Sequence, residues 1–205
     1  YSKMLNFFDP NGSERYWEEL VQKHIDSRIN SNLKISQKDN YKSKKFDYQK
    51  KLNFYTPTKI ASYRVKTLFL KEQDTLEWID EHGGKKNVFF DIGANMGIYS
   101  LYYAHTFQGK VYAFEPSFRN LDLLIRNINL NEMQDLIKVI SNPIYDKMSI
   151  NYFSQDSLIA GEAKGSTYGN KQLKNNFQTL SLTLDSLVNN QTIEFPTMIK
   201  IDVDG

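Results

Sequence analysis

The chain has 205 residues, enough for one α/β domain with an extension, and its 14% aromatic content is typical of a packed domain rather than a disordered one. It contains no cysteine, which excludes disulfides and thiolate metal sites and fits a reducing, cytoplasmic location. A formal net charge of +2 gives no reason to expect nucleic acid or a membrane surface as a partner. The sequence contains no run of 18 apolar residues, so it does not predict a membrane-spanning helix.

The first part of the chain has the pattern of a helical extension. Ser13 is a suitable N-cap for a helix whose apolar residues recur at helical spacing. We place the domain boundary at Thr56-Pro57, a pair that typically interrupts regular structure. We therefore expect an extension over residues 1–55 and a second domain over residues 56–205. The apolar face of the predicted helix consists of Trp17, Leu20, Val21, Ile25 and Ile29.

Residues 34–51 form a basic segment in which seven lysines alternate with aromatic residues. Such a segment can bind nucleic acid or another anionic surface. It can equally be a solvated linker or an exposed helix face. Asp39 and Asp47 dilute its charge and it contains no arginine, so we favour the linker.

A short helix is predicted just before the first buried strand. Asp74 is expected to cap a helix over residues 75–81, with Leu76 and Ile79 facing inward. Gly83 and Gly84 follow, and we expect them to end this helix in the left-handed conformation that glycine favours at a C-cap.

The stretch N-V-F-F-D-I-G-A-N-M-G-I-Y-S, residues 87–100, organises the domain. It starts with an apolar run at residues 88–90 that is typical of a buried parallel strand, breaks at a glycine-bearing turn, and continues from Ile98 in a helical pattern. Residues 110–114 (K-V-Y-A-F) predict the next strand, which is followed by Glu115-Pro116. A strand, a turn, a helix and a second strand form a nucleotide-binding βαβ unit.

The spacing within this unit indicates which nucleotide it binds. Glu115 lies 18 positions after Gly97, about where an acid at the tip of the second strand accepts hydrogen bonds from a ribose diol. A dinucleotide's pyrophosphate requires a third glycine, but Asn95 occupies that position. Asp91 would repel a pyrophosphate, whereas it would attract the ammonium and sulfonium of S-adenosylmethionine. The pattern therefore favours a methyl donor over a dinucleotide.

The chain resembles the FkbM-type methyltransferases in three motifs, F-D-I-G-A-N-M-G-I-Y-S, V-Y-A-F-E-P-S and I-K-I-D-V-D-G. The upstream segment D-T-L-E-W-I-D is also similar to that family. The resemblance covers residues 56–205. It implies S-adenosylmethionine as cofactor and a Rossmann-like class I methyltransferase fold, which is an α/β fold with a mostly parallel sheet and helices on both faces. The family continues beyond this point with further strands, so we expect a C-terminally truncated domain. Its open apolar sheet edge would invite a partner chain, and an oligomer is one expectation.

Downstream, Ser117 is expected to cap a helix with an apolar stripe, and residues 136–140 predict the third strand. Residues 150–153 and 179–184 have extended patterns, and a polar segment at 154–176 separates them. That segment is either a loop covering the substrate or disordered. Asp185 is expected to cap a short helix. Residues 197–203 predict a buried fourth strand. The stripe of the Ser117 helix would consist of Leu121, Leu124, Ile125 and Ile128.

The resemblance also implies which residues form the site. Gly93 and Gly97 would let the backbone approach the donor, Asp91 and Asn95 would bind near its methionine part, and Glu115 would bind its ribose. Ser141 and Asn142 would lie near the adenine, although Asn-Pro is also an ordinary turn former. Asp202, at the carboxyl end of the fourth strand, would stand beside the methyl group, and Asp204 replaces the glutamate usual in the family. The expected cofactor-binding residues are Asp91, Gly93, Ala94, Asn95, Gly97, Glu115, Pro116, Ser141 and Asn142, and the expected catalytic residues are Asp202 and Asp204.

The family's substrates imply O-methylation of a hydroxyl on a small molecule or a glycan. The acceptor's proton would go to a carboxylate or histidine, or its pKa would be lowered by a divalent metal, for which we identify no ligands. Two alternatives remain open. Asp202-Val203-Asp204 is the D-x-D with which glycosyltransferases hold a metal and a nucleotide sugar, and a truncated domain could instead be non-catalytic. An NAD-dependent oxidoreductase is disfavoured by the missing glycine.

Overall fold

The computed structural model describes residues 38–41, 52–71, 73–155, 157–163, 165–166 and 175–203. All of them belong to a compact unit that spans residues 38–205. The predicted helix after Ser13, most of the basic segment and Asp204 lie outside the described residues. The division into an extension over 1–55 and a domain over 56–205 therefore stays a prediction. Within the described part, no helix is long and apolar enough to cross a bilayer.

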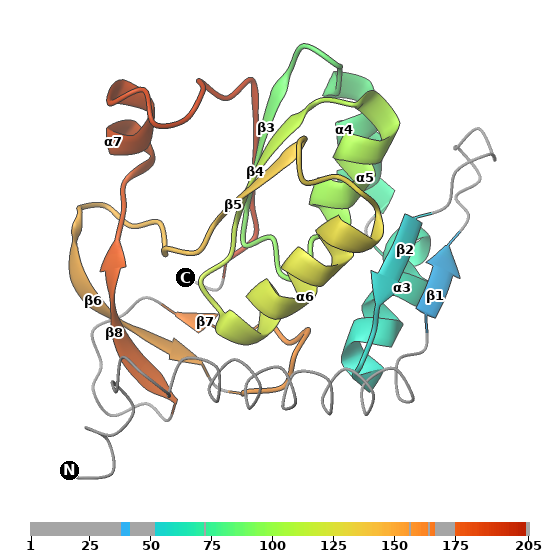
Figure 1. Cartoon of the computed structure of the whole chain (residues 1–205), viewed down its shortest axis with the longest axis horizontal. Coiled ribbons are helices and arrows are strands. Elements are labelled where there is room, and N and C mark those ends of the chain that lie inside the picture. The colour runs from blue at the N-terminus through green and yellow to red at the C-terminus, as the bar shows by residue number, and fades with distance from the viewer. Residues whose placement is uncertain are drawn as a thin grey trace, which may run out of the picture. The chain divides into compact units, whose positions relative to one another are not determined.

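A four-stranded parallel sheet forms the centre of the fold, in the order β5-β4-β3-β9 (Figure 1). This arrangement confirms the predicted α/β class with a mostly parallel sheet. The first strand extends to Ile92, two residues beyond its predicted end, and Asp91 is therefore a strand residue rather than part of the turn. The four strands are β3 (Val88–Ile92), β4 (Lys110–Phe114), β5 (Ile137–Ile140) and β9 (Met198–Ile201).

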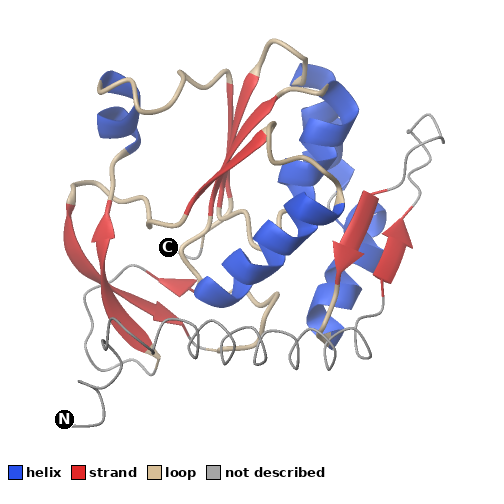
Figure 2. Cartoon of the chain, in the orientation of Figure 1, coloured by secondary structure: helices blue, strands red, loops and turns tan. Residues whose placement is uncertain are grey.

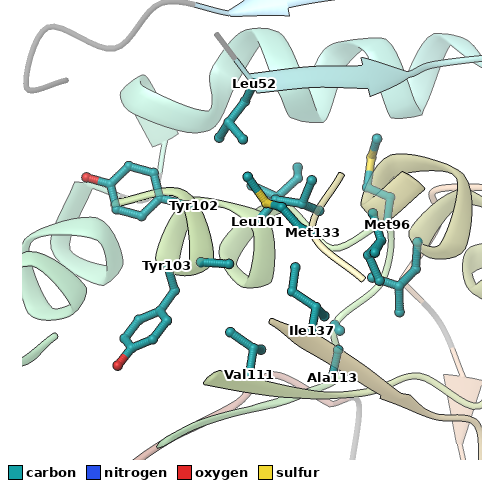
Figure 3. Packing of buried hydrophobic residues seen from close by; sticks show 14 of the residues in the cluster. Leu52, Met96, Leu101, Tyr102, Tyr103, Val111, Ala113, Met133 and Ile137 are labelled. Atoms are coloured by element: carbon teal, nitrogen blue, oxygen red, sulfur yellow. The ribbon is translucent and has the colours of Figure 1, made fainter. Parts of the chain in front are cut away.

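The sheet is covered on both faces, because successive residues of a buried strand point to opposite sides. Phe89 packs with the helices α3, α4, α5 and α6, and Figure 3 shows Leu101 of α5 near Val111 and Ile137 of the sheet. Phe90 packs on the other side with the short helix α7. The expectation of helices on both faces is thus confirmed. These helices are α3 (Lys59–Lys71), α4 (Gln73–His82), α5 (Ile98–Phe107), α6 (Phe118–Leu130) and α7 (Leu184–Asn189).

Ser117 caps α6 as predicted, since its side chain accepts a hydrogen bond from the backbone N–H of Asn120. The predicted apolar stripe is partly wrong, because Ile125 is 45% exposed. A buried Asn127 takes an inward position, where it donates to the carbonyl of Met96 (2.8 Å) and accepts from the backbone of β2. Apolar spacing alone misses a polar residue that packs inward. The residues of α6 that are buried are Asn120, Leu123, Leu124, Asn127 and Ile128.

A small antiparallel sheet precedes α3, formed by β1 (Lys38–Tyr41) and β2 (Leu52–Tyr55). Leu52 and Phe54 are buried in the core, next to α6. The backbone N–H of Asn53 donates to the side chain of Asn131 at the end of α6 (2.8 Å). Residues 52–55 therefore pack with the α/β domain, although they precede the predicted boundary.

The helix before the first strand begins at Gln73, so that Asp74 lies in its first turn, and Leu76 and Ile79 are buried as predicted. The predicted left-handed cap is wrong, because neither Gly83 nor Gly84 has a positive φ. At Gly83 a Cβ would lie 2.2 Å from a ring carbon of Phe107. Close packing, rather than backbone conformation, explains this glycine.

A second sheet, antiparallel and separate from the first, has the order β7-β6-β8 (Figure 2). Strand β6 (Ser149–Gln155) confirms the extended segment predicted at 150–153. Strand β8 (Asn176–Ser181) confirms the segment predicted at 179–184 only over 179–181, because Leu184 begins α7. The short strand β7 (Gly165–Ser166) is added between them. The cap of α7 is Thr183, whose hydroxyl accepts from the N–H of Ser186. The prediction that Asp185 caps this helix is wrong, because Asp185 lies in its first turn.

The fourth strand of the parallel sheet is less buried than predicted. Met198 is buried, but Ile199 and Ile201 are exposed. Among the described residues, β9 pairs only with β3 and is therefore an edge strand. An edge strand has no neighbour to cover it on one side, which explains the exposed apolar side chains.

Candidate functional site

A cavity of about 300 Å³ lies at the carboxyl ends of β3, β4 and β9, the edge where open parallel sheets bind ligands. Glu115 follows β4 and Asp202 follows β9, so the topology brings together two acids that are 87 positions apart (202 − 115). Part of the second sheet and the loop at 157–163 complete the wall. Among the residues lining this first cavity are Gly93, Asn95, Glu115, Pro116, Ser117, Asn142, Phe153, Gln155, Glu162 and Asp202.

A second cavity, of about 330 Å³, adjoins the first. Tyr63 and Thr67 of α3, Tyr99 of α5 and Lys200 of β9 form its walls. The two cavities share the residues that separate them, so a ligand in one would face a ligand in the other across this boundary. The shared residues are Arg64, Gly93, Asn95, Ala163 and Asp202.

Glu115 is 5% exposed and lines the first cavity. Its carboxylate accepts hydrogen bonds from the backbone N–H of Asn95 (2.7 Å) and of Ser117 (2.8 Å), one at each oxygen. Burial raises the pKa of Glu115 to about 7, and these two hydrogen bonds limit the rise. Each carboxylate oxygen retains acceptor capacity for a further donor, such as a ligand hydroxyl.

The loop after β3 is held tightly against both neighbouring strands. The backbone N–H groups of Gly93 and Ala94 both donate to the carbonyl of Phe114 in β4 (2.9 and 3.0 Å). Gly93 has φ +80°, and a Cβ there would lie 2.1 Å from the carbonyl oxygen of Asp202. Only glycine fits at this position. Gly93 and Asn95 line both cavities, and Ala94 lines the second.

Gly97, the other predicted donor-binding glycine, lies elsewhere. It is the N-cap of α5 with φ +84°, and a Cβ would lie 2.4 Å from Cδ1 of Leu124 in α6. It is not among the residues lining either cavity. The close contact between α5 and α6 explains this glycine without a ligand.

Asp91 is fully buried and also outside both cavity linings. Its carboxylate accepts from the hydroxyl of Ser100 (2.7 Å) and forms an ion pair with Lys200 (3.2 Å). The Lys200 ammonium also lies 3.4 Å from the carboxylate of the more exposed Asp202 and 4.8 Å from the ring centroid of Tyr99. Burial alone lowers the pKa of Lys200, but Asp91 and Asp202 raise it above its ordinary value. In this structure the negative charge of Asp91 is therefore paired with the ammonium of Lys200.

The loop at 157–163 lines part of the first cavity and belongs to the segment predicted to be either a substrate-covering loop or disordered. Its carbonyl groups accept hydrogen bonds from three residues: Thr58 donates to Ala160 (2.7 Å), Arg64 to Gly161 (2.6 Å), and Asn95 to Glu162 (3.2 Å). Asn120 of α6 makes two more, donating to the carbonyl of Glu162 (2.9 Å) and accepting from the N–H of Gly161 (2.8 Å).

Of the remaining predicted site residues, some line a cavity and one does not. Pro116 and Asn142 line the first cavity, and the side-chain amide of Asn142 donates to the carbonyl of Leu180 (3.0 Å). Ser141 is exposed and lines neither cavity. Gln155 lines the first cavity but has no sequence signal, because its position in the wall depends on the pairing of β6 with β7, where Gln155 lies opposite Gly165.

The described residues contain no cluster of three or more histidine, cysteine, aspartate or glutamate side chains suited to a metal ion. The arrangement as a whole offers a buried carboxylate, a glycine turn and an apolar wall in one cavity. A second, more polar cavity opens beside it. Such a pair can hold a nucleoside-bearing donor and an acceptor on either side of Asp202.

Solved structures with some similarity include several methyltransferases. They include a human methyltransferase 10 domain containing protein (23% identity, 36% of this chain and 43% of that chain, TM-score 0.32). P. horikoshii TYW2 in complex with MeSAdo has 17% identity over 52% of this chain and 35% of that one, with a TM-score of 0.32. The METTL16 MTase domain has 16% identity over 59% and 55%, with a TM-score of 0.35. This chain spans between 30% and 55% of the length of such structures. No curated protein matches it.

The family assignment rests on the sequence match. A family model described as the methyltransferase FkbM domain matches residues 91–205, more than half of the chain. The matched region begins in β3 and includes Gly93, Asn95, Glu115 and Asp202, which line the cavity at the edge of the parallel sheet. The chain therefore belongs to the FkbM methyltransferase family.

Proposed function

We propose that this chain is an S-adenosylmethionine-dependent O-methyltransferase acting on a hydroxyl of a small molecule or glycan. The observation that carries the proposal is Glu115, a buried acid at the carboxyl end of β4 that lines a cavity next to a glycine turn. A ribose diol has two donors at the spacing of a carboxylate, and an acid in this position of a doubly wound sheet typically binds it. Membership of the FkbM family supports the same cofactor.

The residues of the first cavity fit this cofactor. Glu115 would hold the ribose, the apolar wall that includes Phe153 would contact the adenine, and the turn at Gly93 would contact the methionine part. Gly93 lets this turn lie directly against the carbonyl of Asp202, where a Cβ would lie 2.1 Å from the oxygen, so the turn and Asp202 stay side by side in the cavity wall. When bound, the cofactor supplies an electrophilic methyl group on a sulfonium.

Asp202 lies where the two cavities meet, and this position suggests its role. Its carboxylate is held near Lys200 and could accept the proton of an acceptor hydroxyl in the second cavity. The walls of both cavities would hold the acceptor oxygen in line with the methyl group, an effect worth up to roughly 7–11 kcal/mol in well-oriented systems.

The second cavity favours a hydroxylated acceptor. Its lining combines the polar groups of Arg64, Thr67 and Asp202 with the aromatic ring of Tyr99. Sugars present hydroxyls on their edges and apolar C–H faces, so polar and aromatic side chains together suit them. We therefore propose a sugar hydroxyl, of a glycan or a glycosylated small molecule, as the acceptor.

The acceptor assignment is tested by transfer of label from methyl-tritiated S-adenosylmethionine to a panel of sugars and glycosides. We expect a methyl ether that survives mild alkali, because ester-linked methyl groups would be released. Asp202→Asn should lower the rate about 100-fold or more, whereas Asp146→Asn, an exposed acid outside both cavities, should not. Labelling of amines or carboxylates in place of hydroxyls would overturn the O-methylation proposal.

A further inference from the structure

Arg64 of α3 lines both cavities, and among the described residues it is the only one of this helix that lines the first. Its Nε donates to the carbonyl of Gly161 (2.6 Å). The next two residues of that loop also form cavity wall, since Glu162 lines the first cavity and Ala163 lines both. The bond to Gly161 therefore holds the guanidinium at the boundary between the two cavities.

Most donors of this guanidinium are not engaged. A guanidinium has five N–H groups, and the bond to Gly161 is the only hydrogen bond that the Arg64 side chain makes with described residues. None of the ion pairs within the described part of the chain includes Arg64. Its two terminal nitrogens keep four N–H groups in a planar fork, which matches two oxygens of a carboxylate or a phosphate.

Lys200 is the other cation in the wall of the second cavity, but its charge is already compensated. Its ammonium lies 3.2 Å from the carboxylate of Asp91 and 3.4 Å from that of Asp202. One ammonium thus faces two carboxylates. Among the described residues of this wall, Arg64 is therefore the cation that remains for a ligand.

The two cavities differ in the charges of their described walls. The wall of the first has three acids and one base, which suits the ammonium and sulfonium of the proposed donor. The wall of the second has one acid and two bases. An anionic ligand is therefore better matched to the second cavity than to the first. The acids of the first wall are Glu115, Glu162 and Asp202 and its base is Arg64, whereas the second wall has Asp202 with Arg64 and Lys200.

We propose that Arg64 binds a carboxylate or phosphate of the acceptor, so that the second cavity selects an acidic sugar, such as a uronic acid or a sugar phosphate, over its neutral counterpart. This inference rests on the proposed function and narrows its acceptor class. The volume of about 330 Å³ is near the small end of ligand pockets and suits a single sugar ring. With the anion on Arg64, a hydroxyl elsewhere on the ring would face Asp202 in the same wall.

The test uses pairs of acceptors matched except for their charge: methyl glucoside with methyl glucuronide, methyl galactoside with methyl galacturonide, and glucose with glucose 6-phosphate. Transfer of label from methyl-tritiated S-adenosylmethionine gives kcat and KM for each sugar. The wild-type chain should use the acidic member of at least one pair about tenfold or more efficiently in kcat/KM, mainly through a lower KM. Comparison among the pairs distinguishes a carboxylate from a phosphate.

Variants of Arg64 test the residue itself. Arg64→Gln should reduce the preference for the acidic sugar about tenfold or more by raising its KM, and Arg64→Lys should restore part of it, because the charge returns without the fork. Arg119→Gln removes an exposed arginine outside both cavities and should keep the wild-type preference. Calorimetric titration should give similar affinities of wild type and Arg64→Gln for S-adenosylhomocysteine.

Equal kcat/KM values of the wild type for both members of every pair would overturn the inference and leave the proposed function intact, and this comparison requires no variant to fold. A folded Arg64→Gln that keeps a preference for the acidic sugar would overturn it in the same way. Loss of S-adenosylhomocysteine binding in a folded Arg64→Gln would assign the guanidinium to the carboxylate of the donor and contradict the inference. Transfer to none of these sugars, by a chain that binds S-adenosylhomocysteine, would overturn both the inference and the proposed sugar acceptor.

Discussion

The backbone N–H of Asn95 donates a hydrogen bond of 2.7 Å to Oε2 of Glu115. This bond links the turn after β3 to the end of β4, 20 residues later in the chain. Asn95 has φ +52°, so it adopts the left-handed conformation that asparagine tolerates better than most residues. The acid that we assign to the ribose therefore also fixes the turn that we assign to the methionine part.

The burial of Glu115 predicts how stability depends on pH. Its pKa is raised from 4.5 to about 7 in the folded state, so the folded chain holds this proton more tightly than the unfolded chain does. The contribution of Glu115 to stability is then fully present below pH 4.5 and is lost as the pH rises through 7, by about 3 kcal/mol in all. Urea unfolding of the wild type and Glu115→Gln between pH 5 and 8 measures this contribution.

The variant serves as the control, since glutamine does not ionise and keeps one acceptor oxygen. As the pH rises, the unfolding free energy of the wild type should fall relative to that of Glu115→Gln. Parallel pH profiles for the two proteins would show that Glu115 does not titrate in this range.

The buried ion pair of Lys200 and Asp91 predicts a second effect on stability. Lys200→Met leaves Asp91 buried without its cation, which should lower the unfolding free energy by about 3–5 kcal/mol. Adding Asp91→Asn should recover most of this loss, because the uncompensated charge is removed. Lys110→Met breaks the exposed, solvent-screened pair with Glu194 and should change the unfolding free energy far less. Similar losses for Lys110→Met and Lys200→Met in urea unfolding would contradict the assignment.

Gly97 should be a packing position rather than a binding position. Gly97→Ala combines φ +84° with a Cβ 2.4 Å from Leu124, so we expect a loss of about 1–3 kcal/mol in unfolding free energy. Gly84→Ala meets no atom closer than 3.6 Å at a permitted φ and should be neutral or slightly stabilising. A folded Gly97→Ala that loses S-adenosylhomocysteine binding at unchanged stability would instead place Gly97 in the ligand site.

Asn120 should anchor the loop at 157–163. In Asn120→Ala the N–H of Gly161 loses its acceptor, and we expect its hydrogen exchange to become about tenfold faster while exchange in the central strands changes little. Thr67→Val is the control variant for this exchange measurement. Thr67 lies on α3, and its hydroxyl donates to the carbonyls of Tyr63 and Arg64 rather than to this loop. Unchanged exchange at Gly161 in Asn120→Ala would show that other contacts hold the loop.

The four parallel strands and the helix cap at Ser117 could be predicted from the sequence, because they depend on local patterns. Helix α3 and the short strands β1 and β7 were not predicted. Which residues of α6 face inward could not be predicted, because the buried amide of Asn127 is satisfied by hydrogen bonds to Met96 and to the backbone of β2. From local charge alone, the sequence also predicted that the Asp91 carboxylate attracts the positive charges of S-adenosylmethionine. Its partner Lys200 lies 109 positions away and is identified only once β3 and β9 pair.

The candidate site shows the same division. Gly93, Asn95, Glu115 and Asp202 end strands or follow them directly, so motif and topology together predict that they meet. Gln155 lies between a strand and a polar segment and has no motif. Its place in the cavity wall depends on the antiparallel pairing of β6 with β7, which the sequence pattern does not specify.

The central claim is that the cavity beside Glu115 binds S-adenosylmethionine. Its most direct test is calorimetric titration of the 205-residue chain with S-adenosylhomocysteine, with UDP-sugar plus Mn²⁺ as the competing ligand. We predict micromolar binding of S-adenosylhomocysteine that weakens at least tenfold in a folded Glu115→Gln, and no binding of the UDP-sugar. Absence of S-adenosylhomocysteine binding by the folded chain, or binding of the UDP-sugar in its place, would contradict the assignment.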